Sequence, residues 1–364
     1  MKYSIIIPSY NHLEDCLRPC LDSVLQYTDL VATDGEIIIV LNGCIDGSRG
    51  YTDSLRLRYG DRVRVLWSDD AMGYTRAVNW GIREAIGEYL VLLNNDVVIL
   101  WDGDWLGRLL GPFSDSGVAV TGVSRILDRA SGWDFIIFYC AVIRSDLVRL
   151  FGGLDEVFNP GGGEDIEYCI RMRKLGYKIR SVGDSSAVWG YSTDFPIFHS
   201  GERTVWELPD WDSIWDKNQE LLRDRYREDV RYSIYIDNGV GFDSYGGLVR
   251  CVDSIWNASV MSGLEICGCD RNRGYWDKLG KSQVVRVYRD DMDWMDDIES
   301  RGVVGILLFN DVVVTGDNSD WIRDLDRGVG RLYDYAIGDN WKICYGGRDS
   351  GREWKYSSRY IVSG

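Results

Sequence analysis

Short apolar segments, each ending at polar or turn-forming residues, constrain the fold of this chain most strongly. Four such segments lie at residues 3–7, 37–41, 63–67 and 89–93. Between them, residues 13–27 and 75–86 carry apolar side chains at helical spacing. Strands that alternate with helices predict a parallel α/β sheet. Because ligands of such sheets bind beyond the carboxyl ends of the strands, the polar residues after each segment are the first candidates for a site.

Several segments recur in the same order in the second half of the chain. The repeated pairs include Tyr3-Ser4-Ile5 with Tyr232-Ser233-Ile234, Val63-Arg64-Val65 with Val285-Arg286-Val287, and Asn95-Asp96-Val97 with Asn310-Asp311-Val312. Short apolar strands match easily by chance, but the preserved order favours a true repeat. We therefore expect one domain at residues 1–228 and a second, smaller α/β domain at residues 229–364 that partly repeats the first.

The second copy departs from the first where chemistry is expected. It has Asp237-Asn238-Gly239 in place of Pro8-Ser9-Tyr10. The sequence also ends at Gly364, before a counterpart of the Glu164-Asp165 segment. Either the chain is a fragment of a longer tandem enzyme, or the second copy is a non-catalytic module. We favour the non-catalytic module.

Composition and charge exclude several classes of partner. The formal net charge is −16 and the Lys and Arg residues are scattered, so we expect no nucleic-acid partner. Apolar runs of about 18 residues are absent, so we expect no transmembrane segment and a cytoplasmic protein. Nine cysteines without a repeating framework are typical of reduced thiols. Two histidines far apart in the sequence disfavour a structural zinc site.

A candidate metal ligand follows the strand predicted at residues 89–93. In the triplet Asn94-Asn95-Asp96 only Asp96 is ionised, and a carboxylate oxygen is a hard ligand suited to Mg²⁺ or Mn²⁺. An acidic protein that binds an anionic nucleotide needs local positive charge, which a metal ion supplies. The alternative is an ordinary turn, since Asn and Asp are common turn residues. The triplet by itself leaves both interpretations open.

Five motifs occur along residues 1–205 in one consistent order. They are Ile5-Ile6-Ile7-Pro8-Ser9-Tyr10-Asn11, Val40-Leu41-Asn42-Gly43, Gly73-Tyr74-Thr75-Arg76-Ala77-Val78-Asn79, Leu92-Leu93-Asn94-Asn95-Asp96 and Gly163-Glu164-Asp165. Together they resemble the family 2 glycosyltransferases of the GT-A fold, in particular the rhamnosyltransferase-like branch. The resemblance implies a mostly parallel sheet flanked by helices. It also implies a nucleoside-diphosphate sugar as donor.

The resemblance assigns a group of residues to the nucleotide. These are Pro8, Tyr10, Asn11, Asn42, Gly73, Arg76, Asn79, Asn94 and Asn95. An exposed helix charge and a helix cap are the alternatives for Arg76 and Asn79, respectively. Leu41 departs from many relatives, which carry an acidic residue there. The identity of the base therefore stays open.

The same resemblance assigns the catalytic and metal-binding groups. Asp165, with Glu164 beside it, matches the general base that removes the proton from the attacking acceptor hydroxyl in an inverting transfer. Acidic residues at a helix start are the alternative, because they favour the helix dipole. His199 resembles a late histidine that reaches the metal held by Asp96. A packed or solvated imidazole is its alternative.

The predicted function is an inverting, metal-dependent glycosyltransferase that uses Mn²⁺ or Mg²⁺. Its acceptor would be a hydroxyl of a saccharide, glycan or glycolipid. A nucleotidyltransferase would need a phosphate loop rich in Gly and Lys near the first strand, and none is visible. A non-catalytic module that binds a nucleotide sugar or carbohydrate is the second alternative. Leu41 and the incomplete repeat favour that alternative, whereas the presence of Asp96 and Asp165 disfavours it.

Overall fold

The computed structural model describes the N-terminal half of the chain nearly completely. It describes residues 2–226 except 129–132, 184–188, 193, 202–206 and 209. Beyond residue 226 it describes residues 232–237, 248–249, 251–252, 264–269, 273–279, 286–288, 293–294, 296–297, 304–309, 313–314, 336–337, 341–344 and 354–356. The chain forms two compact units. Unit 1 comprises residues 1–126 and 135–215, and unit 2 comprises residues 127–134 and 216–364.

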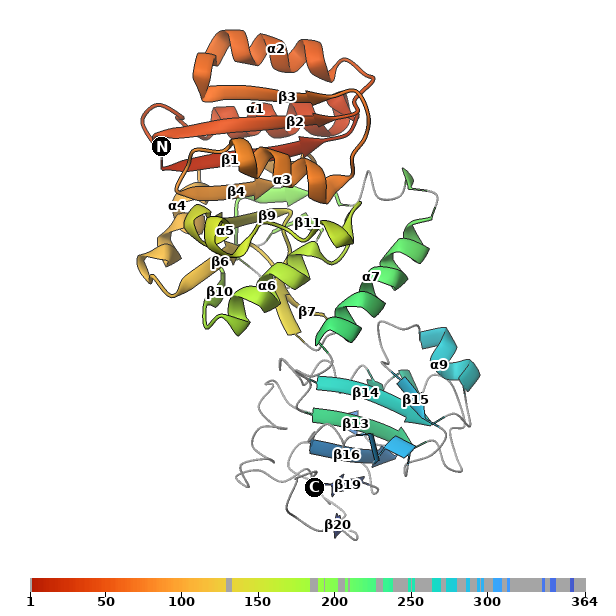
Figure 1. Cartoon of the computed structure of the whole chain (residues 1–364). Coiled ribbons are helices and arrows are strands. Elements are labelled where there is room, and N and C mark those ends of the chain that lie inside the picture. Colours follow the sequence, from red (N-terminus) through yellow and green to blue (C-terminus); the bar gives the residue numbers. More distant parts are fainter. Residues whose placement is uncertain are drawn as a thin grey trace. The chain divides into compact units, whose positions relative to one another are not determined.

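Unit 1 is built on a seven-stranded sheet with the order β10-β6-β9-β4-β1-β2-β3 (Figure 1). The strands are β1 (Tyr3–Ser9), β2 (Gly35–Asn42), β3 (Val63–Ser68), β4 (Tyr89–Leu93), β6 (Val118–Gly122), β9 (Cys140–Arg144) and β10 (Lys178–Ser181). Strands β1 to β4 pair in parallel, and β9 is antiparallel to both of its neighbours. The mostly parallel α/β sheet predicted from the four apolar segments is confirmed.

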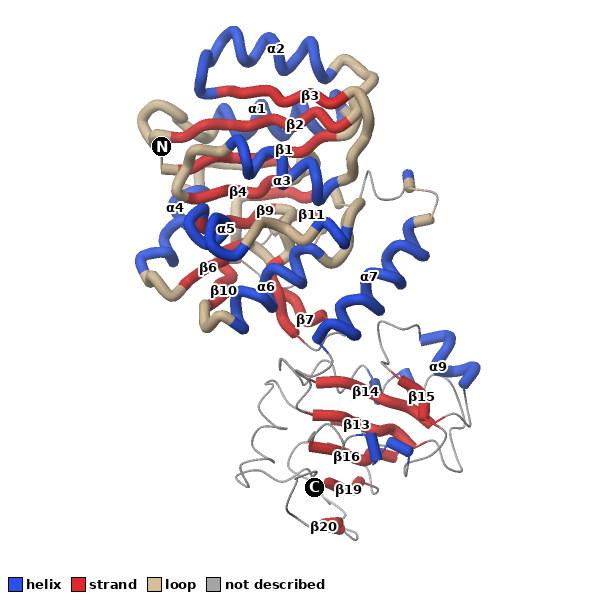
Figure 2. The backbone as a smooth tube through the Cα atoms, viewed as in Figure 1, coloured by secondary structure: helices blue, strands red, loops and turns tan. Residues whose placement is uncertain are grey.

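Helices cover both faces of this sheet, as the ribbon coloured by secondary structure shows (Figure 2). They are α1 (Arg18–Gln26, after a π-helical turn at Leu13–Leu17), α2 (Ser48–Tyr59), α3 (Tyr74–Glu84), α4 (Trp105–Leu110), α5 (Ser145–Phe151) and α6 (Glu164–Lys174). A further helix, α7 (Trp211–Tyr226), contains residues of both units. Short 3-10 turns lie at Gly60–Arg62, Gly111–Ser114 and Glu156–Phe158.

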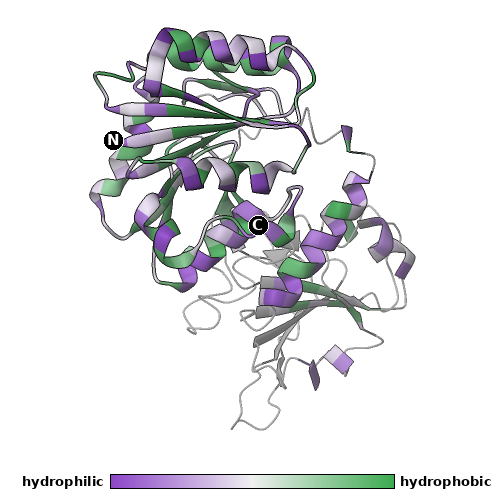
Figure 3. Cartoon of the chain, turned by 45° about the horizontal axis from the view of Figure 1, so that its top comes forward, coloured by the Kyte–Doolittle hydropathy of each residue, from purple (hydrophilic) through white to green (hydrophobic). Residues whose placement is uncertain are grey.

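The core explains why the strand sequences are continuously apolar. Successive side chains of a strand point to opposite faces. In β2, Ile37 and Ile39 pack in the cluster that contains Leu21 of α1, whereas Ile38 packs in the cluster that contains Ala77 of α3. A strand buried on both faces needs an apolar side chain at almost every position. The residues of the helices are of mixed hydropathy, whereas the strands of the sheet are mostly hydrophobic (Figure 3).

A small second sheet in unit 1 brings distant residues to the end of β4. Its order is β11 (Gly190–Tyr191), β12 (Ile197–His199) and β5 (Val97–Ile99), and both pairings are antiparallel. Strand β5 begins directly after Asp96, and His199 is the register partner of Val97. Strands β7 (Arg125–Asp128) and β8 (Trp133–Ile136) pair with each other, and each contains residues of both units. None of the helices among the described residues combines the length and apolarity needed to cross a bilayer.

Unit 2 contains a six-stranded sheet whose order is β15-β14-β13-β16-β19-β20. The strands are β13 (Tyr232–Asp237), β14 (Leu264–Cys269), β15 (Arg286–Tyr288), β16 (Val304–Phe309), β19 (Trp341–Cys344) and β20 (Trp354–Tyr356). Strands β13 to β16 pair in parallel, and β19 is antiparallel to β16 and β20. The unit also contains helix α9 (Arg273–Leu279) and the pair β17 (Val313–Val314) and β18 (Ala336–Ile337).

The two sheets share their connection pattern. In both, the first strand lies between the second and the fourth, the third lies beside the second, and an antiparallel strand follows the fourth. The buried pair Ser4 and Glu36 on β1 and β2 has a register counterpart in buried Ser233 and Glu265. These observations support a structural repeat. The predicted domain division at residue 228 stays a prediction. The compact units change over between Trp215 and Asp216, and residues 127–134 also belong to unit 2.

Candidate active site

The end of β4 is tied to the neighbouring strands by side-chain and backbone hydrogen bonds. The backbone N–H of Asn94 donates to the carbonyl of Tyr139 at 2.9 Å, and the amide of Asn95 donates to the hydroxyl of Ser9 at 3.0 Å. Ser9 is the last residue of β1. The predicted metal motif therefore lies beside the end of the predicted nucleotide strand. This is the sheet edge where α/β proteins bind their ligands.

The two residues predicted to bind the metal lie together although they are far apart in sequence. Oδ1 of Asp96 and Nε2 of His199 are 3.4 Å apart, and the two side chains are only 6–7% exposed. Pairing of β12 with β5 causes this approach, and the N–H of Ser200 donates to the carbonyl of Asp96 at 3.1 Å. The imidazole also stacks on Tyr139, with ring centroids 4.2 Å apart.

This pair suits a divalent cation. Oδ1 of Asp96 makes no hydrogen bond within the part of the chain that the structure describes. A buried carboxylate oxygen without such a bond is costly unless a cation or ligand compensates it. One carboxylate oxygen and one imidazole nitrogen on the same side of the site are suitable ligands for Mn²⁺. That Asp96 and His199 bind a metal ion stays a prediction, and their distance and burial are consistent with it.

The residues predicted to surround the nucleotide join the ends of β1 and β2. Pro8 is buried in β1, and Tyr10 follows the strand and is half-buried. Asn11 adopts a left-handed conformation with φ of 53°, which Asn tolerates better than most residues. Its side-chain oxygen accepts from the N–H of Ile45 at 2.9 Å, and its N–H lies 3.2 Å from the sulfur of Cys44.

Asn42 and Gly73 shape the loop that enters α3. The side-chain oxygen of Asn42 accepts from the N–H of Met72 at 2.6 Å, and the amide of Asn159 donates to the Met72 carbonyl at 2.9 Å. Gly73 has φ of 86°, and a Cβ atom there would overlap the side chain of Asn159. These contacts give Asn42 a role in holding the loop. Its assignment to the base edge stays a prediction.

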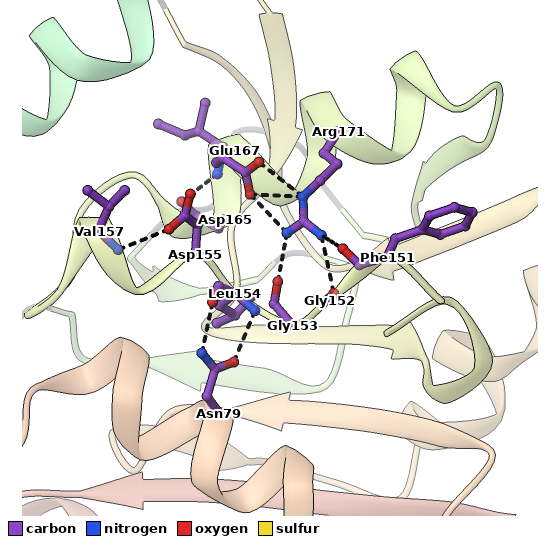
Figure 4. Close-up of polar contacts among 11 residues, drawn as sticks. Asn79, Phe151, Gly152, Gly153, Leu154, Asp155, Val157, Asp165, Glu167 and Arg171 are labelled. Atoms are coloured by element: carbon purple, nitrogen blue, oxygen red, sulfur yellow. Dashed lines mark hydrogen bonds and ion pairs between the residues drawn. The ribbon is translucent and has the colours of Figure 1, made fainter. Parts of the chain in front are cut away.

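Asn79 connects α3 to the segment that precedes α6. Its side chain donates to the carbonyl of Leu154 at 2.8 Å and accepts from the N–H of Leu154 at 3.0 Å (Figure 4). It also donates to Glu156 at 3.2 Å, and Glu156 forms an ion pair with Arg76 at 3.4 Å. Arg76 is 54% exposed. The described contacts of both residues are structural, and their predicted contact with the nucleotide remains untested.

Glu164 and Asp165 begin helix α6 but differ in environment. Asp165 is half-buried, and its carboxylate accepts from the N–H of Ile166 at 2.8 Å. Glu164 is buried, and its Oε2 makes no hydrogen bond to the described residues. Burial, assisted by the charge of Asp165, raises the pKa of Glu164 to about 8. Glu164 is therefore a neutral acid at pH 7, which suits hydrogen-bond donation better than proton abstraction.

Arg171 fixes α6 against the chain that leads to it (Figure 4). Its guanidinium donates to both oxygens of Glu167 at 2.9 to 3.2 Å. It also donates to the carbonyls of Phe151, Gly152 and Gly153 at 2.6 to 3.2 Å. Because Arg presents its donors in a rigid planar fork, this arrangement sets the direction of the helix. The sequence does not predict the bonds to the three carbonyls, because they join residues 18–20 positions apart.

Tyr74 is a site residue that the sequence motifs do not single out. Its N–H donates to the carbonyl of Pro160 at 2.9 Å, and its hydroxyl donates to the carbonyl of Phe138 at 3.5 Å. Burial raises the pKa of Tyr74 well above its usual value, and the charges of Glu164, Asp165 and Asp96 add to the increase. The backbone of Tyr74 thus contacts the segment before α6, and its hydroxyl contacts the residue before Tyr139. Its position directly after Gly73 is the only sequence signal.

His12 stands apart from the predicted metal pair. Its Nε2 lies 2.8 Å from Glu207 and its Nδ1 lies 3.1 Å from Asp15. With Cys16 and Asp15 it forms a group of three possible ligand atoms within 4.8 Å of one another, in the part of the chain that the structure describes. Both imidazole nitrogens already face carboxylates. This arrangement links the predicted nucleotide loop to the segment after His199.

The sequence of this chain is similar to a known family model and to several known proteins. Residues 4–148 match the family model described as Glycosyl transferase family 2. The O-antigen biosynthesis protein RfbC of Myxococcus xanthus is 24% identical over 217 residues, which are 49% of this chain and 16% of that protein. An uncharacterized glycosyltransferase of Nostoc, alr2836, is 34% identical over 134 residues, which are 37% of this chain and 39% of that protein. The chain thus spans less than half of either relative.

Two solved structures were also compared with this chain. The mannosyltransferase PcManGT from Pyrobaculum calidifontis, in complex with GDP-Man and Mn²⁺, has a TM-score of 0.43 and 18% identity. The comparison covers 50% of this chain and 55% of that one. Residues 1–349 of TarS from S. aureus have a TM-score of 0.41 and 14% identity, covering 63% of this chain and 71% of that one.

Proposed function

We propose that the N-terminal unit of this chain, whose residues 4–148 match the model of glycosyl transferase family 2, is an inverting, metal-dependent glycosyltransferase. The donor is a nucleoside-diphosphate sugar, and the acceptor is a hydroxyl of a saccharide, glycan or glycolipid. The observation that carries the proposal is the approach of Asp96 and His199 at the sheet edge where Asn95 contacts Ser9. The carboxylates that begin α6 supply the second half of the site.

Asp96 and His199 would hold Mn²⁺ or Mg²⁺. Such an ion would neutralise charge on the departing diphosphate. The chain is acidic, with a formal net charge of −16, so it offers little fixed positive charge for this purpose. Pro8, Tyr10, Asn11, Asn42 and Asn95 would form the nucleotide pocket, because they lie at or just beyond the ends of β1, β2 and β4.

Asp165 would act as the general base. An inverting transfer needs a group that takes the acceptor proton on the face of the sugar opposite the diphosphate. Asp165 is half-buried, whereas Glu164 is buried and neutral at pH 7. Arg171 and Glu167 hold the helix that carries both residues. The proposed roles are therefore proton acceptor for Asp165 and neutral hydrogen-bond donor for Glu164.

Two variants test the base. Asp165→Asn should lower transfer at least about 1,000-fold, because general-base catalysis contributes roughly 10²–10⁴-fold and the acceptor would also lose a charged partner. Its affinity for the nucleoside diphosphate should stay within about twofold of the unmodified protein. Glu164→Gln is the matched control and should keep most activity at pH 7, since Gln resembles the neutral acid. Equal losses in both variants would remove Asp165 from the proposed role.

The metal is tested by binding rather than by turnover. Calorimetric titration of UDP, GDP, dTDP and CDP, each with and without Mn²⁺, identifies the base that the protein prefers. Asp96→Asn and His199→Gln should each weaken nucleotide binding in Mn²⁺ and change it little without metal. A loss of equal size under both conditions would argue against metal ligation. Binding in Mn²⁺ without turnover of any donor would favour the non-catalytic binding module instead.

We also propose that residues 229–364 form a partial, non-catalytic copy of the GT-A-like unit. The shared strand order and the repeated pair Ser233 and Glu265 support this proposal. Asn310 and Asp311, the counterparts of Asn95 and Asp96, lie outside the described residues. Asp311→Asn should leave transfer unchanged under the conditions in which Asp96→Asn abolishes it. A comparable loss in both variants would mean that the second unit takes part in catalysis.

A further inference from the structure

The backbone and Cβ of Tyr74 are held by the segment that leads into α6. Its N–H donates to the carbonyl of Pro160 at 2.9 Å. Its Cβ lies 3.7 Å from the position that a Cβ on Gly161 would take. Helix α3 begins at this residue, and two other ties, from Asn159 and Asn79, join the same two segments. The start of the side chain is therefore fixed relative to α6.

The hydroxyl of Tyr74 is held much less firmly than its backbone. It donates to the carbonyl of Phe138 at 3.5 Å, which is long for an O–H···O hydrogen bond. Phe138 directly precedes Tyr139, the residue whose ring stacks on His199. The hydroxyl thus contacts the residue next to the one that packs on the predicted metal pair. A weak internal bond costs little to exchange for a stronger one with a ligand.

The surroundings of the phenol define what it can bind. Burial raises the pKa of Tyr74, and the acidic groups of Glu164, Asp165 and Asp96 add to the increase, so the phenol is neutral. A neutral phenol beside carboxylates acts as an O–H donor. Its O–H can donate to an uncharged sugar hydroxyl, which brings no further negative charge beside Asp165. Oε2 of Glu164, which lacks a hydrogen bond within the described residues, offers a second polar group for the same kind of ligand.

We propose that Tyr74 is a positioning residue whose hydroxyl donates a hydrogen bond to a ring hydroxyl of the sugar that is transferred. The inference rests on the proposed function, because it takes Asp96 to mark the diphosphate and Asp165 to mark the acceptor. Tyr74 is tied at one end to the segment that leads to Asp165 and at the other to the residue before Tyr139, which stacks on His199, so it lies between these two markers. The bond orients the sugar so that its anomeric carbon faces the acceptor, which is a contribution of position.

The test uses Tyr74→Phe in the full chain, with Tyr27→Phe as the matched control. The Tyr27 hydroxyl also makes a long bond, of 3.4 Å, to a backbone carbonyl, that of Leu100. Three quantities are measured for each variant: the melting temperature, the affinity for the preferred nucleoside diphosphate with Mn²⁺, and kcat and KM for its sugar donor. Deoxy analogues of that donor then identify the hydroxyl that is read.

We expect Tyr74→Phe to lower kcat/KM about tenfold, the value of one hydrogen bond between uncharged groups. Its nucleotide affinity and melting temperature should match those of Tyr27→Phe. For one deoxy donor, the unmodified protein and Tyr74→Phe should be equally active, because neither can form the bond. Unchanged kcat/KM, or an equal loss of diphosphate affinity, overturns the inference while the proposed function stands. If the unmodified protein turns over no donor, the proposed function fails and the inference fails with it.

Discussion

Replacement of Arg171 by Met should destabilise unit 1 through the loss of a nearly buried ion pair. The change keeps an unbranched side chain of similar length but removes the guanidinium that contacts Glu167 and three backbone carbonyls. Glu167 is 5% exposed and would lose its ion pair with Arg171. Loss of one partner from a buried pair costs about 3–5 kcal/mol, and the 21% exposure of Arg171 favours the lower end.

A loss of about 3 kcal/mol corresponds to a decrease in melting temperature of roughly 6–12 °C for a domain of this size. Differential scanning calorimetry of the full chain measures it, and Arg180→Met, at an exposed position of β10, is the control. The double variant with Glu167→Gln should recover part of the loss, because no unpaired charge remains. If Arg171→Met melts no lower than Arg180→Met, or if the two changes are simply additive, the clamp does not hold α6.

Two further predictions concern pH and backbone conformation. The pKa of Glu164 is about 8 in the folded protein, so its proton is bound in the folded state but lost from the unfolded state between about pH 4.5 and 8. The free energy of unfolding should therefore fall by roughly 1.4 kcal/mol per pH unit over that window. Glu164→Gln should flatten the dependence of melting temperature on pH. If the melting temperatures of the variant and the unmodified protein depend on pH in the same way, Glu164 is not a buried neutral acid. Gly73→Ala should lower the free energy of unfolding by about 2 kcal/mol or more, because φ is 86° and the methyl group would overlap Asn159. Denaturant unfolding measures this loss. A loss below about 0.5 kcal/mol would show that the loop adapts to a side chain at this position.

The strands of unit 1 were predictable from sequence because burial on both faces demands continuous apolar runs. Residues 3–7 and 37–41 fall inside β1 and β2, and the metal motif follows β4 as expected. Helix α1 was predicted to begin at Leu13, whereas the chain first forms a π-helical turn after His12, which has φ of 59°. Such a turn has no periodicity of its own that a pattern of apolar residues could reveal.

Contacts between distant segments could not be predicted in the same way. Pairing of β5 with β12, which brings His199 to Asp96, joins short strands that carry little periodic signal. The sequence suggested His199 only through its resemblance to a family. The bonds of Asn79 to Leu154 and of Arg171 to Gly153 connect loops whose geometry depends on tertiary packing. For the same reason the motif at residues 73–79 predicts no role for Tyr74.

The bonds that join α3 to the segment before α6 bear on how the substrate specificity of such a protein can change in evolution. Asn79 and Asn159 attach α3 and the loop before it to the segment that precedes α6, the helix with the proposed base. These bonds fix the spacing between the proposed nucleotide loop and the proposed base within the scaffold. Substitutions in surface loops can then exchange one sugar or acceptor for another while the reaction geometry stays constant. Selection for new specificity would act on those loops and spare the two asparagines.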